Sequence, residues 1–352
     1  MTQMITSSPF PKYILPIITS ILFNMSAIID RLPLELLELV CDELDTRDLA
    51  SLVGTCRDTY HRTINRLAQR YTEIHLDFSQ DSFNHIHAIA NNKVMRQQVH
   101  RLVVMTPEPY LGRDLQWQRS AAGHIHNPLQ IPAIQRFRDD LVERLTNCRS
   151  FVISPVRTKF VPEEEDVNDS EHFNPDDAAG ILLEIIADAS LPMKLFWYGT
   201  GVNYTSNIMD IRRLPKNLFT NPTFKSGWAQ LENLHLDHKL TPYNYSFILN
   251  MILHAPNLRK IYLSLAPRDM AIEFFSHLSQ SPSLPSSLER IALCFTSVRA
   301  VDLITILSHS RQTLKRLILD DIGGLSSDGS KLHNQLQGCF PRLETIDFNK
   351  CQ

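Results

Sequence analysis

Two pairs of histidines in the 352-residue sequence have a spacing that metal ligands can use, His85 with His87 and His124 with His126. In an extended strand, residues two apart project to the same side, so each pair could offer two imidazoles to one ion. The segment around His85 has a helical pattern, however, and in a helix residues two apart diverge by about 200°. The second pair has no carboxylate or cysteine nearby in the sequence to complete a site. We therefore expect no metal site and no cofactor.

The cysteines and glycines argue against other classes of chemistry. The six cysteines form no C-x-x-C pair and no disulfide or zinc spacing, which predicts reduced thiols in the cytoplasm or the nucleus. The 11 glycines are about half the usual share, so a glycine-rich loop that holds phosphates is not expected. We find no hydrolase pattern and no paired-carboxylate pattern in the sequence. We expect that the chain is not an enzyme.

The balance of charge and the amino-terminal residues bear on the partners. Lys and Arg number 35 against 38 Asp and Glu, a net charge of −3, which argues against a nucleic-acid partner. The apolar run Tyr13–Phe23 is too short to cross a bilayer, which takes about 20 residues. We expect no membrane partner, although a degenerate signal anchor is an alternative. Residues 1–24 are interpreted as a disordered extension, or translation begins at Met25.

A short leucine pattern, L-x-x-[LI]-x-[LF], recurs five times between Leu231 and Phe348, at intervals of 26 to 30 residues. About 12 residues with helical periodicity lie between successive copies, so the pattern predicts parallel strands that alternate with helices. Counting weaker copies, we expect about nine strands, four before residue 200 and five after residue 230. The weaker copies are Ile74-Leu76, Leu102-Val104, Phe151-Ile153 and Leu195-Trp197.

The strand pattern also predicts which side chains share a face of the sheet. The second and third leucine-type residues point into the core, and the residues before, between and after them lie on the other face. Three rows across five strands follow: Asn233, Lys260, Arg290, Arg316, Thr345; His235, Tyr262, Ala292, Ile318, Asp347; and Asp237, Ser264, Cys294, Asp320, Asn349. From them we select Lys260, Tyr262, Arg290, Arg316 and Ile318 as candidate target-binding residues, since the cations could bind a carboxylate or a phosphate. The alternative is a solvated sheet face without a ligand.

The segment Ile28–Tyr71 predicts three helices, because its apolar residues recur at helical spacing. Asp45 could cap the second helix, whose apolar stripe continues from Leu49 through Cys56 to Tyr60. Three helices in about 45 residues cannot bury all of this surface among themselves. We expect the surplus to contact another protein.

Residues 25–70 resemble the F-box. They share its L-P-x-E-[IL]-[LI] start at Leu32, the D-L-x-x-L motif at Asp48 and the closing Cys56-Arg57. They depart from it by Gly54 inside the second helix and by Thr59-Tyr60 where many members have tryptophan. The resemblance implies docking on the Skp adaptor of a cullin ubiquitin ligase. The residues that it assigns to adaptor binding are Leu32, Pro33, Leu36, Leu37, Val40, Leu44, Leu49, Leu52, Val53 and Cys56. A generic three-helix cap on the following repeats is the alternative.

Residues 71–352 resemble degenerate leucine-rich repeats of the long, ribonuclease-inhibitor-like class. The resemblance implies a solenoid with a curved parallel sheet, and the swollen spacing of the early copies predicts insertions near 107–130 and 156–177. The run from Glu163 to Asp177 holds eight acids and no Lys or Arg, and we interpret it as a disordered acidic loop. As a hypothesis, this loop mimics an acidic target and occupies the row that contains Lys260, Arg290 and Arg316. A doubly wound or barrel α/β enzyme would show the same alternation of strands and helices.

Together the two resemblances imply an α/β protein with an amino-terminal F-box and a carboxy-terminal leucine-rich-repeat solenoid. Such a protein is expected to act as the substrate receptor of a Skp-cullin-F-box ubiquitin ligase in the cytoplasm, the nucleus or both. Its target is unknown and is expected to be acidic or phosphorylated. A scaffold that acts outside the ligase, or an α/β enzyme, are the alternatives.

Overall fold

The computed structural model describes residues 31–105, 111–121, 123–154, 172–199, 208–325, 336 and 338–349. The chain divides into two compact units. The helical unit runs up to Thr72 and also contains Lys93–Gln98, and the sheet unit contains Glu73–Asn92 and the residues from Val99 onward. The expected extension at residues 1–24 lies outside the described residues.

The helical unit consists of short helices around one apolar core. Its helices are α2 (Leu34–Glu43), α3 (Thr46–Val53), α4 (Arg57–Gln69) and α6 (Met95–Gln98). The Asp45 side chain accepts a hydrogen bond from the Asp48 amide at 2.8 Å, so it caps α3 as expected. The core residues are Leu37, Cys41, Leu49, Leu52, Val53, Ile64 and Leu67.

The expected single stripe from Leu49 to Tyr60 is wrong, because it is divided between α3 and α4. Gly54 is the residue that ends α3, so it does not weaken a helix interior. Cys56 precedes α4, and its Sγ accepts a hydrogen bond from the Thr59 amide at 3.4 Å. The expected continuous helix is therefore replaced by two helices, with Gly54 at the end of α3 and Cys56 at the start of α4.

The sheet unit is built on a nine-stranded parallel sheet within the described residues, with the strands in sequence order. Four strands lie before residue 200 and five after residue 230, as the leucine pattern predicts. A doubly wound sheet would reverse its strand order at a switch point, whereas sequential order is that of a solenoid. The strands are β1 (Glu73–Leu76), β2 (Arg101–Val104), β3 (Ser150–Ile153), β4 (Leu195–Gly199), β5 (Asn233–Lys239), β6 (Lys260–Ala266), β7 (Arg290–Ser297), β8 (Arg316–Gly323) and β9 (Thr345–Asn349).

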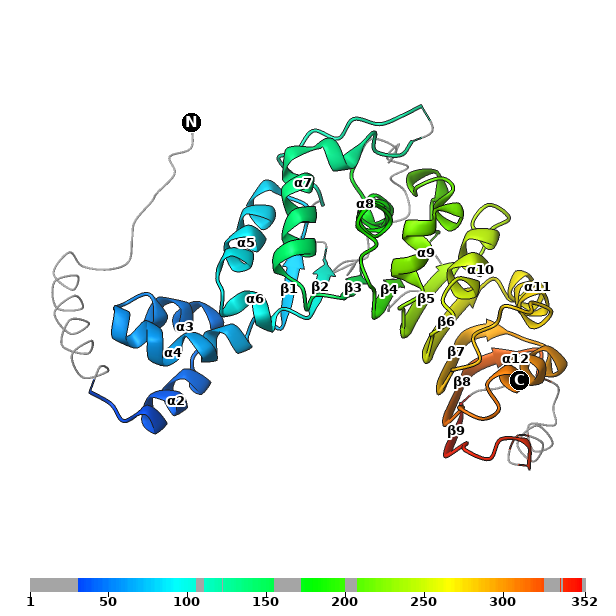
Figure 1. Cartoon of the computed structure of the whole chain (residues 1–352). Helices are drawn as coiled ribbons and strands as arrows, with labels where there is room; N and C mark the ends of the chain where they lie inside the picture. Colours follow the sequence, from blue (N-terminus) through cyan, green and yellow to red (C-terminus); the bar gives the residue numbers. More distant parts are fainter. Residues whose placement is uncertain are drawn as a thin grey trace, which may run out of the picture. The chain divides into compact units, whose positions relative to one another are not determined.

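Helices connect the strands and lie along one side of the sheet (Figure 1). We call the other side of the sheet the opposite face. The longer helices of this unit are α5 (Gln80–Asn91), α7 (Pro132–Asp139), α8 (Pro175–Ala189), α9 (Pro222–Trp228), α10 (Tyr245–Leu253), α11 (Arg268–Ser279) and α12 (Ala300–His309). Short helical turns are η1 (Pro128–Gln130), η2 (Asp140–Arg144), η3 (Ile211–Arg213) and η4 (Leu218–Thr220). Among the described helices, none combines the length and the apolar character that a membrane span requires.

The end of the acidic run departs from its interpretation as a disordered loop. Asp176 and Asp177 are buried in the first turn of α8, where Asn174 forms a capping box with Asp177. Acidic residues favour a helix amino terminus because of the helix dipole and the free backbone amides there. The acids from Glu163 to Glu171 lie outside the described residues, so the hypothesis that they occupy the row of Lys260, Arg290 and Arg316 stays a prediction.

Part of the expected insertion near 107–130 packs within the sheet unit, against the residues just before α8. The Trp117 ring lies 4.4 Å from the Phe173 ring, centroid to centroid, and the Trp117 indole donates a hydrogen bond to the Gly112 carbonyl at 2.7 Å. The insertion expected at 156–177 ends where α8 begins, at Pro175.

Candidate protein-interaction surfaces

Helix α2 exposes several large apolar side chains, of which Leu36 and Leu39 lie on the side of the helix opposite its buried residues. Leu37 and Cys41 point inward and are almost fully buried. The exposed residues, which we call the α2 patch, are Leu34, Leu36, Leu39 and Val40. An exposed leucine cluster on so small a unit is typical of a protein-interaction surface.

The inner side of α2 is fixed to α4. Arg66 Nη2 of α4 lies 2.9 Å from Glu38 Oε2, and the Arg62 guanidinium donates a hydrogen bond to the Leu32 carbonyl just before α2. These contacts hold the α2 patch in one orientation relative to α4.

The structure separates the ten residues predicted to bind an adaptor into two groups. Leu36, Val40 and Pro33 are exposed, and Leu32, Leu44 and Cys56 are partly exposed. The remaining four fill the core of the helical unit, so their side chains are closed to a partner: Leu37, Leu49, Leu52 and Val53.

Leu34 and Leu39 belong to the α2 patch but were not among the residues predicted to bind an adaptor. The run from Leu34 to Val40 places leucines on more than one side of the helix, so periodicity alone does not say which side is buried. The signal that could have found them is this excess of leucine in a helix of 10 residues.

On the sheet unit, the three predicted rows of side chains have the expected register. Asn233, Lys260, Arg290, Arg316 and Thr345 are paired from strand to strand, from β5 to β9. The second and third rows follow two and four residues later on each strand. The structure therefore places all five candidate target-binding residues on adjacent strands β6, β7 and β8.

Three cations of the first row lie side by side. Lys260, Arg290 and Arg316 are exposed, and parallel strands separate them by about 4.8 Å per step. Arg316 Nε donates to Thr345 Oγ1 at 3.1 Å. In the described part of the chain, the side chains of Lys260 and Arg290 have no hydrogen-bond or ion-pair partner. We call these three residues the cationic row.

At the position immediately before each of these strands, by contrast, the charges alternate in sign from strand to strand. There, Arg259 Nε lies 2.8 Å from Glu289 Oε1, and Lys315 Nζ lies 3.2 Å from Glu289 Oε2. Opposite charges on neighbouring strands stabilise a sheet, whereas like charges directly opposite destabilise it. The cationic row is therefore an unfavourable arrangement for the isolated sheet, and an anionic ligand would relieve it.

An aromatic stack lies in the second row, on strands β4, β5 and β6. The ring centroids of Trp197 and His235 are 4.1 Å apart, and those of His235 and Tyr262 are 3.8 Å apart. Burial, with a smaller contribution from His238, lowers the pKa of His235 to about 3, so its ring is uncharged at neutral pH. Trp197 was missed because the predicted rows began at residue 233, although the register pairs Trp197 with His235.

The third row was expected to face solvent, and this expectation is wrong on β5, β6 and β7. Asp237, Ser264 and Cys294 are all buried. The strands continue beyond this row, and the Tyr262 side chain hydrogen-bonds to Cys294. Burial raises the pKa of the Cys294 thiol, and the Tyr262 hydrogen bond opposes this rise.

The candidate metal-binding histidines have protein partners. His85 and His87 lie on α5, as the helical pattern predicts, and His87 Nδ1 is 2.8 Å from Asp140 Oδ2. His124 Nδ1 is 2.8 Å from Ser120 Oγ. In the described ranges, no group of three or more His, Cys, Asp or Glu side chains is placed to hold a metal ion.

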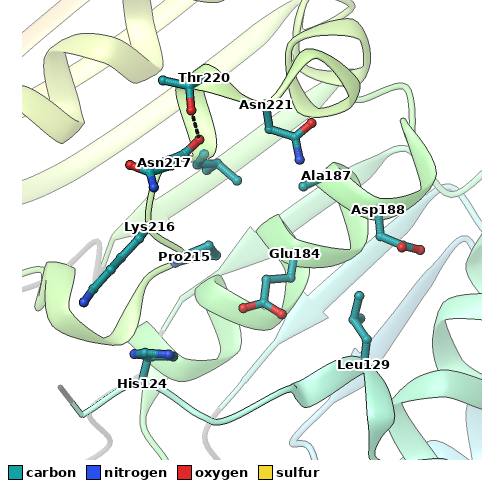
Figure 2. Close-up of a pocket in the computed structure, with 11 residues that line it drawn as sticks. His124, Leu129, Glu184, Ala187, Asp188, Pro215, Lys216, Asn217, Thr220 and Asn221 are labelled. Atoms are coloured by element: carbon teal, nitrogen blue, oxygen red, sulfur yellow. Dashed lines mark hydrogen bonds between the residues drawn. The ribbon is translucent and has the colours of Figure 1, made fainter. Parts of the chain in front are cut away.

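A cavity of about 550 Å³ lies on the helix side of the sheet unit, between α8 and the segment 215–221 (Figure 2). Glu184, His124 and Lys216 line it, and burial raises the pKa of Glu184 to about 7. Asp188, one turn further along α8, also lines the cavity and pairs with Arg138 at 2.7 Å. None of the sequence patterns described above indicated this cavity.

No protein-family model matches the chain, and no curated protein matches its sequence.

Proposed function

We propose that this chain is a non-catalytic substrate receptor of a Skp-cullin-F-box ubiquitin ligase. The helical unit acts as the F-box and binds the Skp adaptor, and the sheet unit acts as a degenerate leucine-rich-repeat domain that binds the target. The observation that carries the proposal is the α2 patch, which stays exposed although the helical unit already has a complete core.

The α2 patch supports an adaptor site by its chemistry. Leu36 and Leu39 are 49% and 62% exposed, and covering such side chains is favourable by about 25 cal/mol per Å² of apolar surface. A helix that presents apolar residues at this spacing suits docking into a groove on a partner. The F-box resemblance of residues 25–70 names the Skp adaptor as that partner.

The sheet unit supports a target site by its order and its charge. Sequential parallel strands form an extended face of the kind that repeat proteins use for binding. The cationic row on that face favours an acidic or phosphorylated target. The chain would accelerate ubiquitin transfer by proximity alone, because it holds target lysines near the conjugating enzyme.

Affinity purification with mass spectrometry tests the proposal. The tagged full chain should recover a Skp adaptor and a cullin, and the variant Leu36→Asp/Leu39→Asp should lose both while circular dichroism shows an unchanged fold. Val301→Asp is the matched control, because Val301 is an equally exposed apolar residue, on α12 of the sheet unit. Failure of the wild-type chain to recover an adaptor, or equal recovery by the α2 variant, contradicts the proposal.

A further inference from the structure

We propose that the opposite face of the sheet unit binds an extended peptide segment of two parts, an aromatic side chain followed or preceded by anionic side chains. The inference rests on the proposed function, in which the sheet unit holds the target, and it names the chemistry of that target. The aromatic part lies at strands β4 to β6, and the anionic part lies at β6 to β8.

The chemistry of the face changes at β6. On β4 and β5 the first row is uncharged, with Leu195 and Asn233, and the second row is aromatic, with Trp197 and His235. From β6 onward the first row is cationic. The second row there continues from Tyr262 to smaller aliphatic residues, Ala292 and Ile318. Lys260 and Tyr262, two residues apart on β6, are the junction of the two halves.

The exposed cations Lys260, Arg290 and Arg316 indicate the anionic part of the ligand. Lys260 and Arg290 lack an acidic partner among the described residues, although the position just before them is fully paired through Glu289. A planar guanidinium binds carboxylate and phosphate groups with two parallel hydrogen bonds. Carboxylates and phosphates share this chemistry, and the experiment below separates them.

The aromatic stack on β4 to β6 indicates the aromatic part of the ligand. Trp197, His235 and Tyr262 are each partly exposed, and their rings are uncharged at neutral pH. The Trp197 indole N–H is buried and has no hydrogen-bond acceptor within the described residues, so it is the ring, not the N–H, that a bound side chain can contact. Aromatic rings prefer other aromatic rings as neighbours, in offset-stacked or edge-to-face arrangements.

The spacing of the strands sets the length of the bound peptide. Four strand steps separate β4 from β8, or about 19 Å at about 4.8 Å per step. An extended peptide advances about 3.3 Å per residue, so about six residues cover the whole distance. The cationic row spans about 10 Å, which is the distance that an extended peptide covers in about three residues at about 3.3 Å per residue.

Fluorescence anisotropy with the purified full chain tests this inference. The probes are fluorescein-labelled eight-residue peptides that contain one phenylalanine at one end and three glutamates at the other, in both orders. Comparison peptides lack either the phenylalanine or the glutamates, and a further peptide has phosphoserine in place of glutamate. We expect one two-part peptide to bind about tenfold or more tightly than either single-part peptide, with an affinity that falls as salt rises.

Variants assign the two halves. Arg290→Glu/Arg316→Glu should weaken every anionic peptide about tenfold or more, and Tyr262→Ala should weaken only the peptides that contain phenylalanine. Lys216→Glu/Lys225→Glu is the matched control, because it makes the same change of charge in the cavity-lining segment and on α9, and it should leave binding unchanged. If the reversal variant does not fold, Arg290→Gln/Arg316→Gln replaces it.

The results separate this inference from the proposed function. Tighter binding of the glutamate or of the phosphoserine peptide identifies the anion that is read. Equal binding of two-part and single-part peptides, or unchanged binding by the charge-reversal variant, overturns the inference even if the same chain still recovers a Skp adaptor. Loss of adaptor recovery from the wild-type chain would instead overturn the proposed function and would leave the peptide result standing.

Discussion

Replacing Asp177 by asparagine should strongly destabilise the sheet unit. The Asp177 carboxylate is fully buried at the start of α8 and receives hydrogen bonds from Arg119 at 2.7 and 2.8 Å and from Arg213 at 2.7 Å. Arg119 comes from the insertion after β2, and Arg213 comes from η3, so one carboxylate joins three segments of the sheet unit. The substitution removes the counter-charge that two largely buried guanidinium groups share, although Arg213 still has Asp210 at 3.7 Å.

The expected loss of stability follows from the burial of the Asp177 ion pairs. Removing one partner of a buried ion pair costs about 3–5 kcal/mol, because the remaining charge is desolvated and unpaired. The matched control is Asp188→Asn, also on α8, whose pair with Arg138 has the same 2.7 Å distance but is 42% exposed on the Asp188 side. An exposed pair contributes about 0–1 kcal/mol. Asp177→Asn should therefore cost about 2–5 kcal/mol more than the control.

Urea unfolding followed by circular dichroism measures the difference. With a slope of about 2–3 kcal/mol per M for a unit of this size, Asp177→Asn should lower the midpoint by about 1–2 M, and Asp188→Asn should barely move it. Equal midpoints for the two variants would refute the argument that this buried carboxylate holds the three segments together.

Three further predictions concern stability. Leu37→Ala should destabilise the helical unit by about 2–5 kcal/mol in thermal unfolding, whereas Leu36→Ala should cost less than about 1 kcal/mol, and equal losses would contradict the assignment of the two faces of α2. Because burial raises the pKa of Glu184 to about 7 from an ordinary value of 4.5, the folded state loses stability as pH rises toward and through 7. Glu184→Gln should therefore raise the unfolding midpoint relative to wild type at pH 8 and much less at pH 5, and a gain independent of pH would contradict this cause. Deleting residues 258–287, one repeat, should leave a folded chain with a smaller helical signal, since each repeat packs on its neighbours, and complete unfolding would argue against a solenoid.

The strand register was predictable because leucine spacing encodes it. Side chains in a strand alternate between two faces, so fixing the buried leucines also fixes which residues share the other face. This is why Lys260, Arg290 and Arg316 could be placed in one row from the sequence. The same rule extended to Trp197 would have found the aromatic stack.

Other features depend on tertiary contacts that the sequence pattern does not contain. The acidic run looks solvated because of its composition, yet Asp177 becomes buried through Arg119 and Arg213, which are 58 and 36 residues away. The Asn174-Pro175 pair before α8 is a local signal of a helix start that could have corrected this expectation. In α2 the leucines surround the helix, and only packing on α4 decides that Leu37 is inside and Leu39 outside.

Direct titration of the purified full chain with a purified Skp adaptor tests the central claim. Isothermal titration calorimetry should give a complex of one chain with one adaptor. Leu36→Ala/Leu39→Ala removes about half of one leucine and about 60% of another from the interface, or about 1.7–3.3 kcal/mol, which corresponds to about 15- to 250-fold weaker binding. Val301→Ala on α12 should leave the affinity unchanged. Absence of a complex at micromolar concentrations, or an affinity that the α2 substitutions leave unaltered, would contradict the account.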